Sequence, residues 1–287
     1  MDGILRATAW APGTCGELVE GSIDGKTFLV TCPIDIGSTI ELNREATGFP
    51  PDFPKTARAI ELAAAKLGLP VRELGFERES GLPPGKGMGS STADMAAAVL
   101  AACRLAGQEM SPREIAELAL MVEPSDGTMF PGLVLFDHRE GKWLEELGEA
   151  PAINILIADP GGEVDTIAFN QDGYLEKMNE KKEPQVREAL RLIREGLASG
   201  DLNKIGRGAT ESALANQELL PKPDLPQMLK WAEEVKALGV NVAHSGTVMG
   251  LLLPEDGYHP EEVKPFIQKR RPDWTFYCTR LVNGGLK

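Results

Sequence analysis

The chain has 287 residues, and its 43 acidic side chains against 30 basic ones give a net charge of −13. This length is enough for one large domain or two ordinary domains around a buried core. The acidic balance argues against a protein that binds the nucleic-acid backbone. The apolar run at 95–103 is far shorter than the about 20 residues that cross a bilayer. We therefore expect a globular protein with no nucleic-acid partner and no membrane partner.

Cysteine and histidine usage indicates a reducing compartment and no His-based metal site. The four cysteines are scattered without a C-x-x-C pair, and the three histidines are far apart in sequence. The segment that follows Met1 lacks the basic and apolar regions of a secretory signal. The expected location is the cytoplasm.

Strand-like and helix-like segments alternate in the first half of the chain. Short β-branched segments bounded by Gly or Pro predict strands, and apolar residues at helical spacing predict helices. Ser111 and Glu114 form a capping box that predicts a helix start. The predicted strands here are 4–10, 27–32, 38–42, 71–78 and 132–137, and the predicted helices are 55–67, 95–105 and 112–122.

The second half is richer in helix-like segments. It contains predicted strands at 153–158, 248–253 and 275–282 and predicted helices at 183–198, 202–214, 225–238 and 260–270. Strands mixed with segregated helices indicate an α+β fold. A domain boundary near residue 150 divides the chain into 1–150 and 151–287.

A glycine-rich loop directly before the alanine-rich helix is the most informative stretch. Its glycines let the backbone approach a ligand closely, and two serines open a helix whose free N–H groups attract an anion. The spacing fits neither a Walker motif nor a Rossmann motif. The alternative is a plain helix start, with Asp94 in a capping box. The residues predicted to cradle phosphate are Pro84, Gly85, Lys86, Gly87, Met88, Gly89, Ser90, Ser91 and Thr92.

This loop resembles the phosphate loop of the GHMP kinases, which include galactokinase and the homoserine, mevalonate and phosphomevalonate kinases. The resemblance lies in Pro83-x-x-x-Gly87-Met88-Gly89-Ser90-Ser91, and the segments 11–17 and 243–250 resemble the first and third family motifs, with Thr14 in place of a lysine. It implies a two-part α+β fold, with a ribosomal S5-like N-terminal domain and a ferredoxin-like C-terminal domain. ATP and the acceptor would lie between them.

Within that superfamily, the segments 12–18, 31–35, 86–94 and 123–127 look like those of the L-threonine kinases. This resemblance implies transfer of the γ-phosphoryl group of ATP to the side-chain hydroxyl of L-threonine, giving L-threonine O-3-phosphate for cobalamin synthesis. Two alternatives stay open at this point. One is a kinase of another small alcohol such as homoserine, and the other is a non-catalytic ligand-binding protein of the same fold.

Phosphoryl transfer needs a phosphate cradle, a metal ion and a group that orients or deprotonates the acceptor. The resemblance implies Mg²⁺ held by Ser91 and Glu123, and Asp126 as the base for the acceptor hydroxyl. The alternatives are an ordinary exposed carboxylate for Glu123 and a simple turn for Asp126.

The acceptor pocket is harder to predict. A free amino acid carries an ammonium and a carboxylate, which an enzyme meets with opposite charges. Glu17, Asp35 and Arg139 are candidate contacts because they lie close in sequence to the motifs, whereas His244 is expected to be structural. The sequence leaves monomer and homodimer open.

Overall fold

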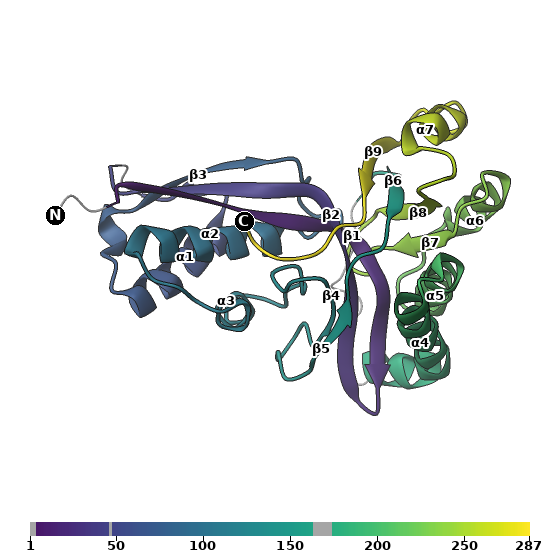
Figure 1. Cartoon of the computed structure of the whole chain (residues 1–287), viewed down its shortest axis with the longest axis horizontal. Coiled ribbons are helices and arrows are strands. Elements are labelled where there is room, and N and C mark those ends of the chain that lie inside the picture. The colour runs from purple at the N-terminus through teal and green to yellow at the C-terminus, as the bar shows by residue number, and fades with distance from the viewer. Residues whose placement is uncertain (1–3, 46–47, 163–173) are drawn as a thin grey trace.

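The computed structural model describes residues 4–45, 48–162 and 174–287. Its N-terminal half is organised around a long antiparallel hairpin of β1 (Arg6–Ile23) and β2 (Lys26–Asn43) (Figure 1). The turn uses Asp24 and Gly25, both with positive φ. The hairpin is joined by β3 (Gly75–Ser80), β4 (Leu133–Phe136) and β5 (Leu144–Gly148), and by helices α1 (Pro54–Leu67), α2 (Ser90–Ala106) and α3 (Pro112–Leu120), with a 3₁₀ turn η1 (Val71–Glu73).

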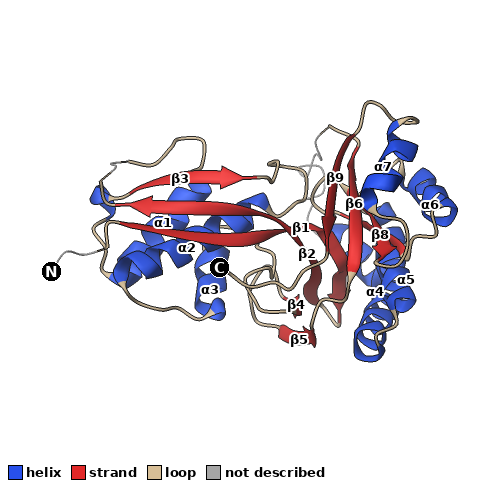
Figure 2. Ribbon diagram, turned by 45° about the horizontal axis from the view of Figure 1, so that its top comes forward, coloured by secondary structure: helices blue, strands red, loops and turns tan. Residues whose placement is uncertain are grey.

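The C-terminal half is an antiparallel group of strands with helices packed beside it (Figure 2). Helix α5 lies against β7, and α4 packs on both α5 and β1. The strands are β6 (Ile153–Asp159), β7 (Gly239–Val242), β8 (Met249–Pro254) and β9 (Thr275–Arg280). The helices are α4 (Tyr174–Ser199), α5 (Leu202–Ala215), α6 (Leu225–Glu234) and α7 (Pro260–Gln268), with a 3₁₀ turn η3 (Asn216–Glu218).

One sheet runs through both halves in the order β5-β4-β2-β1-β7-β8-β6-β9, with β3 beside β2. The halves join where Glu17 of β1 pairs with Val242 of β7. The C-terminal tail then returns to the first half, where Lys287 and Trp10 exchange two backbone hydrogen bonds of 2.7 and 2.9 Å. Within the described ranges, no helix is both long and apolar enough to cross a membrane.

The predicted helices are present, and the main differences concern strands. The predicted strand 4–10 continues to Ile23, and 27–32 and 38–42 belong to one strand, because Pro33 lies where the β1–β2 register is irregular. The predicted strand 71–78 starts only at Gly75, after η1. Sequence patterns missed β5, whose half-exposed edge residues lack clear alternation, and the short β7.

Several predicted helices have different ends; α2, for example, begins at Ser90 and not at 95. Helix α6 stops at Glu234, short of the predicted 238, because the chain turns through Lys236 with a positive φ of 54°. Helix α4 begins at Tyr174 and runs through Pro184, so it is longer than the predicted 183–198. The capping box at Ser111 and Glu114 is confirmed.

Asp94 does not cap α2, and this corrects the capping-box alternative. Its carboxylate is buried and accepts hydrogen bonds from Ser38 Oγ at 2.5 Å and from Arg78 Nε at 2.8 Å. Through these two bonds, Asp94 ties α2 to Ser38 on β2 and to Arg78 on β3.

We expect Asp94→Ala to lower the free energy of unfolding by about 3 kcal/mol, because Arg78 would keep its charge without a partner in a buried site. Urea denaturation measures the change. The matched control is Arg58→Met, which breaks an exposed pair with Glu61 on α1 and should cost less than about 1 kcal/mol. Equal effects of the two substitutions would contradict the structural role of the Asp94–Arg78 pair.

Candidate active site

Three glycine-containing segments that are far apart in sequence meet at the loop before α2. The N–H groups of Thr14 and Gly16 donate to the carbonyls of Met88 and Gly87, at 3.0 and 3.1 Å. From the other side, the N–H groups of Thr247 and Val248 donate to the Lys86 carbonyl at 3.0 and 3.2 Å. The loop is therefore held by backbone bonds from both halves of the chain.

Glycine is required where these segments touch. Gly87 has a φ of +80°, and a Cβ there would lie 2.2 Å from the Ala243 Cβ. A Cβ on Gly246 would lie 2.1 Å from the Gly87 nitrogen. Contact this close excludes any side chain at either position.

The loop borders a hollow of about 380 Å³ that collects most of the predicted site residues. We call it the loop hollow. Its described lining adds Lys55, Pro124 and Ser245 to the sequence-based set. The predicted residues in the lining are Glu17, Gly85, Gly87, Met88, Gly89, Ser90, Ser91, Thr92, Glu123 and Asp126.

Helix α2 presents its N-terminus to this hollow. Gly89 is the N-cap in a left-handed conformation, and it supplies no side-chain cap. The first intrahelical bond is made by the Ala93 N–H to the Gly89 carbonyl, at 2.9 Å. The N–H groups before Ala93, together with the helix dipole, form a site for an anion such as phosphate.

Ser91 and Glu123 are in direct contact in the lining of the loop hollow. The Ser91 hydroxyl donates to Glu123 Oε1, and the Lys55 ammonium donates to Glu123 Oε2 at 2.5 Å. A hydroxyl and a carboxylate in contact are hard oxygen donors of the kind that Mg²⁺ takes beside phosphates. The donor set therefore fits the predicted magnesium ligands, with Lys55 providing the positive charge at Glu123.

Asp126 lies against the start of α2. Its backbone N–H donates to Thr92 Oγ1 at 3.2 Å, and its Oδ2 would lie 3.0 Å from a Cβ on Gly89. Burial raises the pKa of Asp126 to about 7, and the negative charges of Glu17 and Glu20 act in the same direction. A carboxylate with this pKa can exchange a proton near neutral pH.

Glu17 is buried next to His244, with its Oε2 2.8 Å from Nδ1 of the imidazole and 2.9 Å from the His244 N–H. Burial raises the pKa of Glu17 to about 7, against the opposing His244 N–H bond and lysine charges. Burial lowers the pKa of His244 to about 4, so its ring is neutral at pH 7. The expected structural role of His244 agrees with this arrangement.

Glu20 joins this pair although sequence reasoning missed it. Its Oε2 lies 3.5 Å from His244 Nδ1, and the ligand atoms of Glu17, Glu20 and His244 all lie within 4.8 Å of one another. Residues three apart on a regular strand face opposite sides. The register of β1 shifts between Glu17 and Val19, and this bulge brings both carboxylates to one side. The trio could receive a metal ion or another cation.

Three residues predicted to contact the ligands do not line the loop hollow. The Lys86 ammonium turns to the Gly162 carbonyl, at 2.8 Å, and to Asp159, at 3.5 Å, so it does not line the loop hollow. Asp35 accepts from Thr279 Oγ1 at 2.5 Å and pairs with Arg280, which ties β2 to β9. Arg139 lines a separate surface hollow with Lys26 and Trp143.

A second hollow of about 550 Å³ adjoins the first and shares Lys55, Gly85, Ser90 and Ser91 with it. Predicted residue Pro84 lines this one. The other described lining residues are Asp52, Phe53, Pro54, Thr56, Arg78 and Asp94. We call it the aromatic hollow, after Phe53, whose ring lies 5.0 Å from the Arg78 guanidinium carbon.

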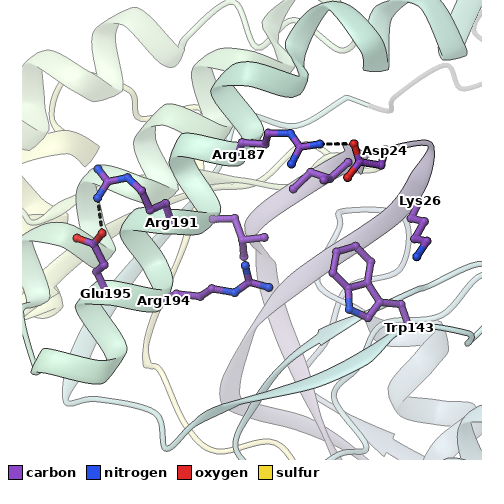
Figure 3. A pocket seen from close by; sticks show the side chains of 9 residues that line it. Asp24, Lys26, Trp143, Arg187, Arg191, Arg194 and Glu195 are labelled. Atoms are coloured by element: carbon purple, nitrogen blue, oxygen red, sulfur yellow. Dashed lines mark hydrogen bonds and ion pairs between the residues drawn. The ribbon is translucent and has the colours of Figure 1, made fainter.

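A groove of about 610 Å³ between the β1–β2 turn and α4 is rich in arginine (Figure 3). Its arginines are already paired: Arg187 with Asp24, Arg191 with Glu195, and Arg194 with Glu145. Its described lining has no residue in common with the loop hollow. None of the predicted site residues is among its described lining.

Two family models and several curated proteins match this chain. The family of GHMP kinases N terminal domains matches residues 55–130, and the family of GHMP kinases C terminal domains matches residues 193–271. The chain is 31% identical over 290 residues to the L-threonine kinase of Salmonella typhimurium, covering 98% of this chain and 95% of that protein. It is 30% identical to the L-threonine kinase of Citrobacter freundii, covering 98% and 99%.

Among solved structures, a homoserine kinase from Cytophaga hutchinsonii matches with a TM-score of 0.74 at 19% identity, covering 100% of this chain and 98% of that one. The chain belongs to the GHMP kinase family, and it is an ATP-dependent kinase of a small-molecule substrate. The expected two-part α+β fold is confirmed. The division at residue 150 itself stays a prediction.

We expect Gly87→Ala to abolish ADP binding, because the new Cβ would overlap Ala243 and displace the loop. Isothermal titration measures the binding, and thermal unfolding measures the accompanying loss of stability. Gly85→Ala is the matched control: its φ is +73°, but the described residues leave open space around its Cβ, so only a strain of about 1–2 kcal/mol is expected. Normal ADP binding by Gly87→Ala would contradict the close contact between the loop and Ala243.

Proposed function

We propose that this kinase transfers the γ-phosphoryl group of ATP to the side-chain hydroxyl of L-threonine, giving L-threonine O-3-phosphate for cobalamin synthesis. The observation that carries the proposal is that one hollow brings together the glycine-rich loop, the Asp126 carboxylate and Glu17. Glu17 also belongs to a cluster with Glu20 and His244 that could hold a cation. An amino acid with a hydroxyl side chain has the matching functional groups. The two relatives named L-threonine kinases support the same acceptor.

The loop and the N-terminus of α2 would hold the phosphate chain through backbone N–H groups. Ser91 and Glu123 would hold Mg²⁺, which supplies positive charge against the charge that develops on the transferring group. The loop is pinned on both sides by backbone bonds to Gly16 and Thr247. Its N–H groups are therefore oriented before substrate binds, which is how fixed dipoles contribute to catalysis.

Asp126 would take the proton of the acceptor hydroxyl. Its pKa of about 7 lets it be ionised at neutral pH and still basic enough to accept a proton. The Thr92 side chain contacts Asp126 and holds it beside the first turn of α2. The hydroxyl oxygen would then be directed at the phosphate bound on the same turn.

Glu17 and Glu20 would bind the ammonium group of the acceptor. Their carboxylates lie on the same side of β1, and Glu17 lines the loop hollow together with Asp126. His244 fixes Glu17 through two contacts, one from its backbone N–H and one from its ring. An ammonium at this place would also compensate the negative charges that burial makes unfavourable.

The aromatic hollow would hold the base of the nucleotide. Phe53, Pro54 and Pro84 give it apolar and aromatic surface, and it opens onto Ser90 and Ser91 at the phosphate site. A flat heterocycle next to a phosphate chain requires this combination of surfaces.

We expect ADP release from Mg-ATP with L-threonine but not with galactose or mevalonate. L-serine and L-homoserine test the reach of the hydroxyl, and 2,3-dihydroxybutanoate, which lacks the ammonium, should lose at least about tenfold in kcat/KM. Mass spectrometry of the product should place the phosphate on the side-chain oxygen. Preferential turnover of L-homoserine would keep the kinase and replace the acceptor, and turnover of no panel member would overturn the proposal.

We expect Asp126→Asn to lower kcat by about 10²–10⁴-fold with little change in ADP affinity. In the unchanged enzyme, kcat/KM should rise with pH up to about 7 as Asp126 loses its proton, and the substitution should remove this rise. A pH profile measures both. Equal losses of kcat and ADP affinity would make Asp126 part of the scaffold and not a base.

Asp126→Asn should also change how the stability of the protein depends on pH. Because the pKa of Asp126 is higher in the folded state than its ordinary value of 3.8, the folded protein takes up a proton that the unfolded chain does not, between about pH 4 and pH 7. Stability contributed by this group is therefore lost as the pH rises across that window. Asp126→Asn should be at least as stable as the unchanged protein at pH 8, which thermal unfolding can show.

A further inference from the structure

The described lining of the loop hollow carries more acidic than basic side chains. Three carboxylates line it, from Glu17, Glu123 and Asp126, and among the described lining residues Lys55 is the one cation. The phosphate chain of ATP brings several further negative charges. A single divalent ion beside three carboxylates leaves that charge under-compensated, so a protein cation is needed.

The other nearby basic residues are committed to other partners. Lys86 contacts Asp159 and the Gly162 carbonyl, and Arg78 is bonded to Asp94 through its Nε. The buried Lys222 donates to the Gly246 carbonyl, and Lys182 donates to Asn216 Oδ1 at 3.2 Å. Lys55 differs from these because its side chain is 55% exposed and its partner, Glu123, is itself the proposed metal ligand.

The position of Lys55 is also unfavourable for the helix that carries it. It lies in the first turn of α1, directly after Pro54, where the described chain has no acidic residue and the N-cap Phe53 makes no side-chain cap. A cation at a helix N-terminus opposes the helix dipole. Helix stability therefore does not explain this lysine, whereas its place in the lining of both the loop hollow and the aromatic hollow does.

We propose that Lys55 binds the phosphate chain of the nucleotide. Without nucleotide its ammonium neutralises Glu123, which it contacts at 2.5 Å. With nucleotide, the half-exposed Lys55 ammonium binds the phosphate oxygens next to Ser90 and Ser91, whether or not a metal ion is present. Where Mg²⁺ is present, Glu123 is then free to hold it. This inference rests on the proposed site for phosphoryl transfer, and it adds a residue that none of the three glycine motifs contains.

The test is ADP affinity without metal, measured by isothermal titration in EDTA. Lys55→Met should weaken this binding about ten- to hundredfold, as for the loss of a charge-assisted hydrogen bond, and should flatten its dependence on salt. Lys55→Arg, which keeps the charge, should retain most of the affinity. The matched control is Lys66→Met, on the same helix with an exposed partner, Glu114, and it should bind like the unchanged protein.

The outcomes separate this inference from the proposed function. If Lys55→Met changed the magnesium requirement but left metal-free ADP affinity intact, Lys55 would only hold Glu123 and the inference would fail. Equal losses in Lys55→Met and Lys66→Met would point to the helix as a whole and would also overturn it. Failure of the unchanged protein to bind ADP both with and without Mg²⁺ would overturn the proposed function itself.

Discussion

The site depends on a few backbone hydrogen bonds around residues 86–88. They connect the loop to β1 on one side and to the segment before β8 on the other, and they need glycine at 87 and 246, where any Cβ would collide. The carbonyls of the loop are used in these contacts. The N–H groups in the first turn of α2, before Ala93, have no partner within the helix, and an anion in the hollow can satisfy them. The proposed phosphate site and the junction of the two halves therefore share the same loop.

In the proposed site the carboxylates at this junction supply the chemistry, and their burial opposes their ionised forms. Glu17 and Asp126 are held where burial raises their pKa values to about 7, which is unfavourable for the ionised forms that the fold must carry above neutral pH. Positively charged ligands would relieve this cost. A metal ion at Glu123 and an ammonium at Glu17 would be bound partly because they offset the negative charge of these carboxylates.

Sequence patterns predicted the features that depend on neighbouring residues in the chain. The loop at 84–92, the capping box at Ser111 and most helices follow from spacing and turn chemistry. Glu20 could not be found this way, because a bulge in β1 decides which side it faces. Asp35 lies near a motif in sequence, yet it bonds to β9 because sheet register places Thr279 beside it. Lys55 carried a weak signal: a lysine where a helix start favours an acidic residue.

Thr14 stands where the first motif of the GHMP kinases has a lysine. In this chain, the cation of the proposed site therefore comes from a different element. Its hydroxyl donates to the Gly16 carbonyl at 2.5 Å and accepts from the Cys32 N–H at 3.1 Å, so this buried side chain fastens β1 to β2. A lysine at this position would lose both bonds and would add a buried charge. The loop lysine, Lys86, is held by Asp159. With both positions used to build the fold, positive charge for the phosphates has to come from the rim of the hollow, where Lys55 can move without disturbing the core.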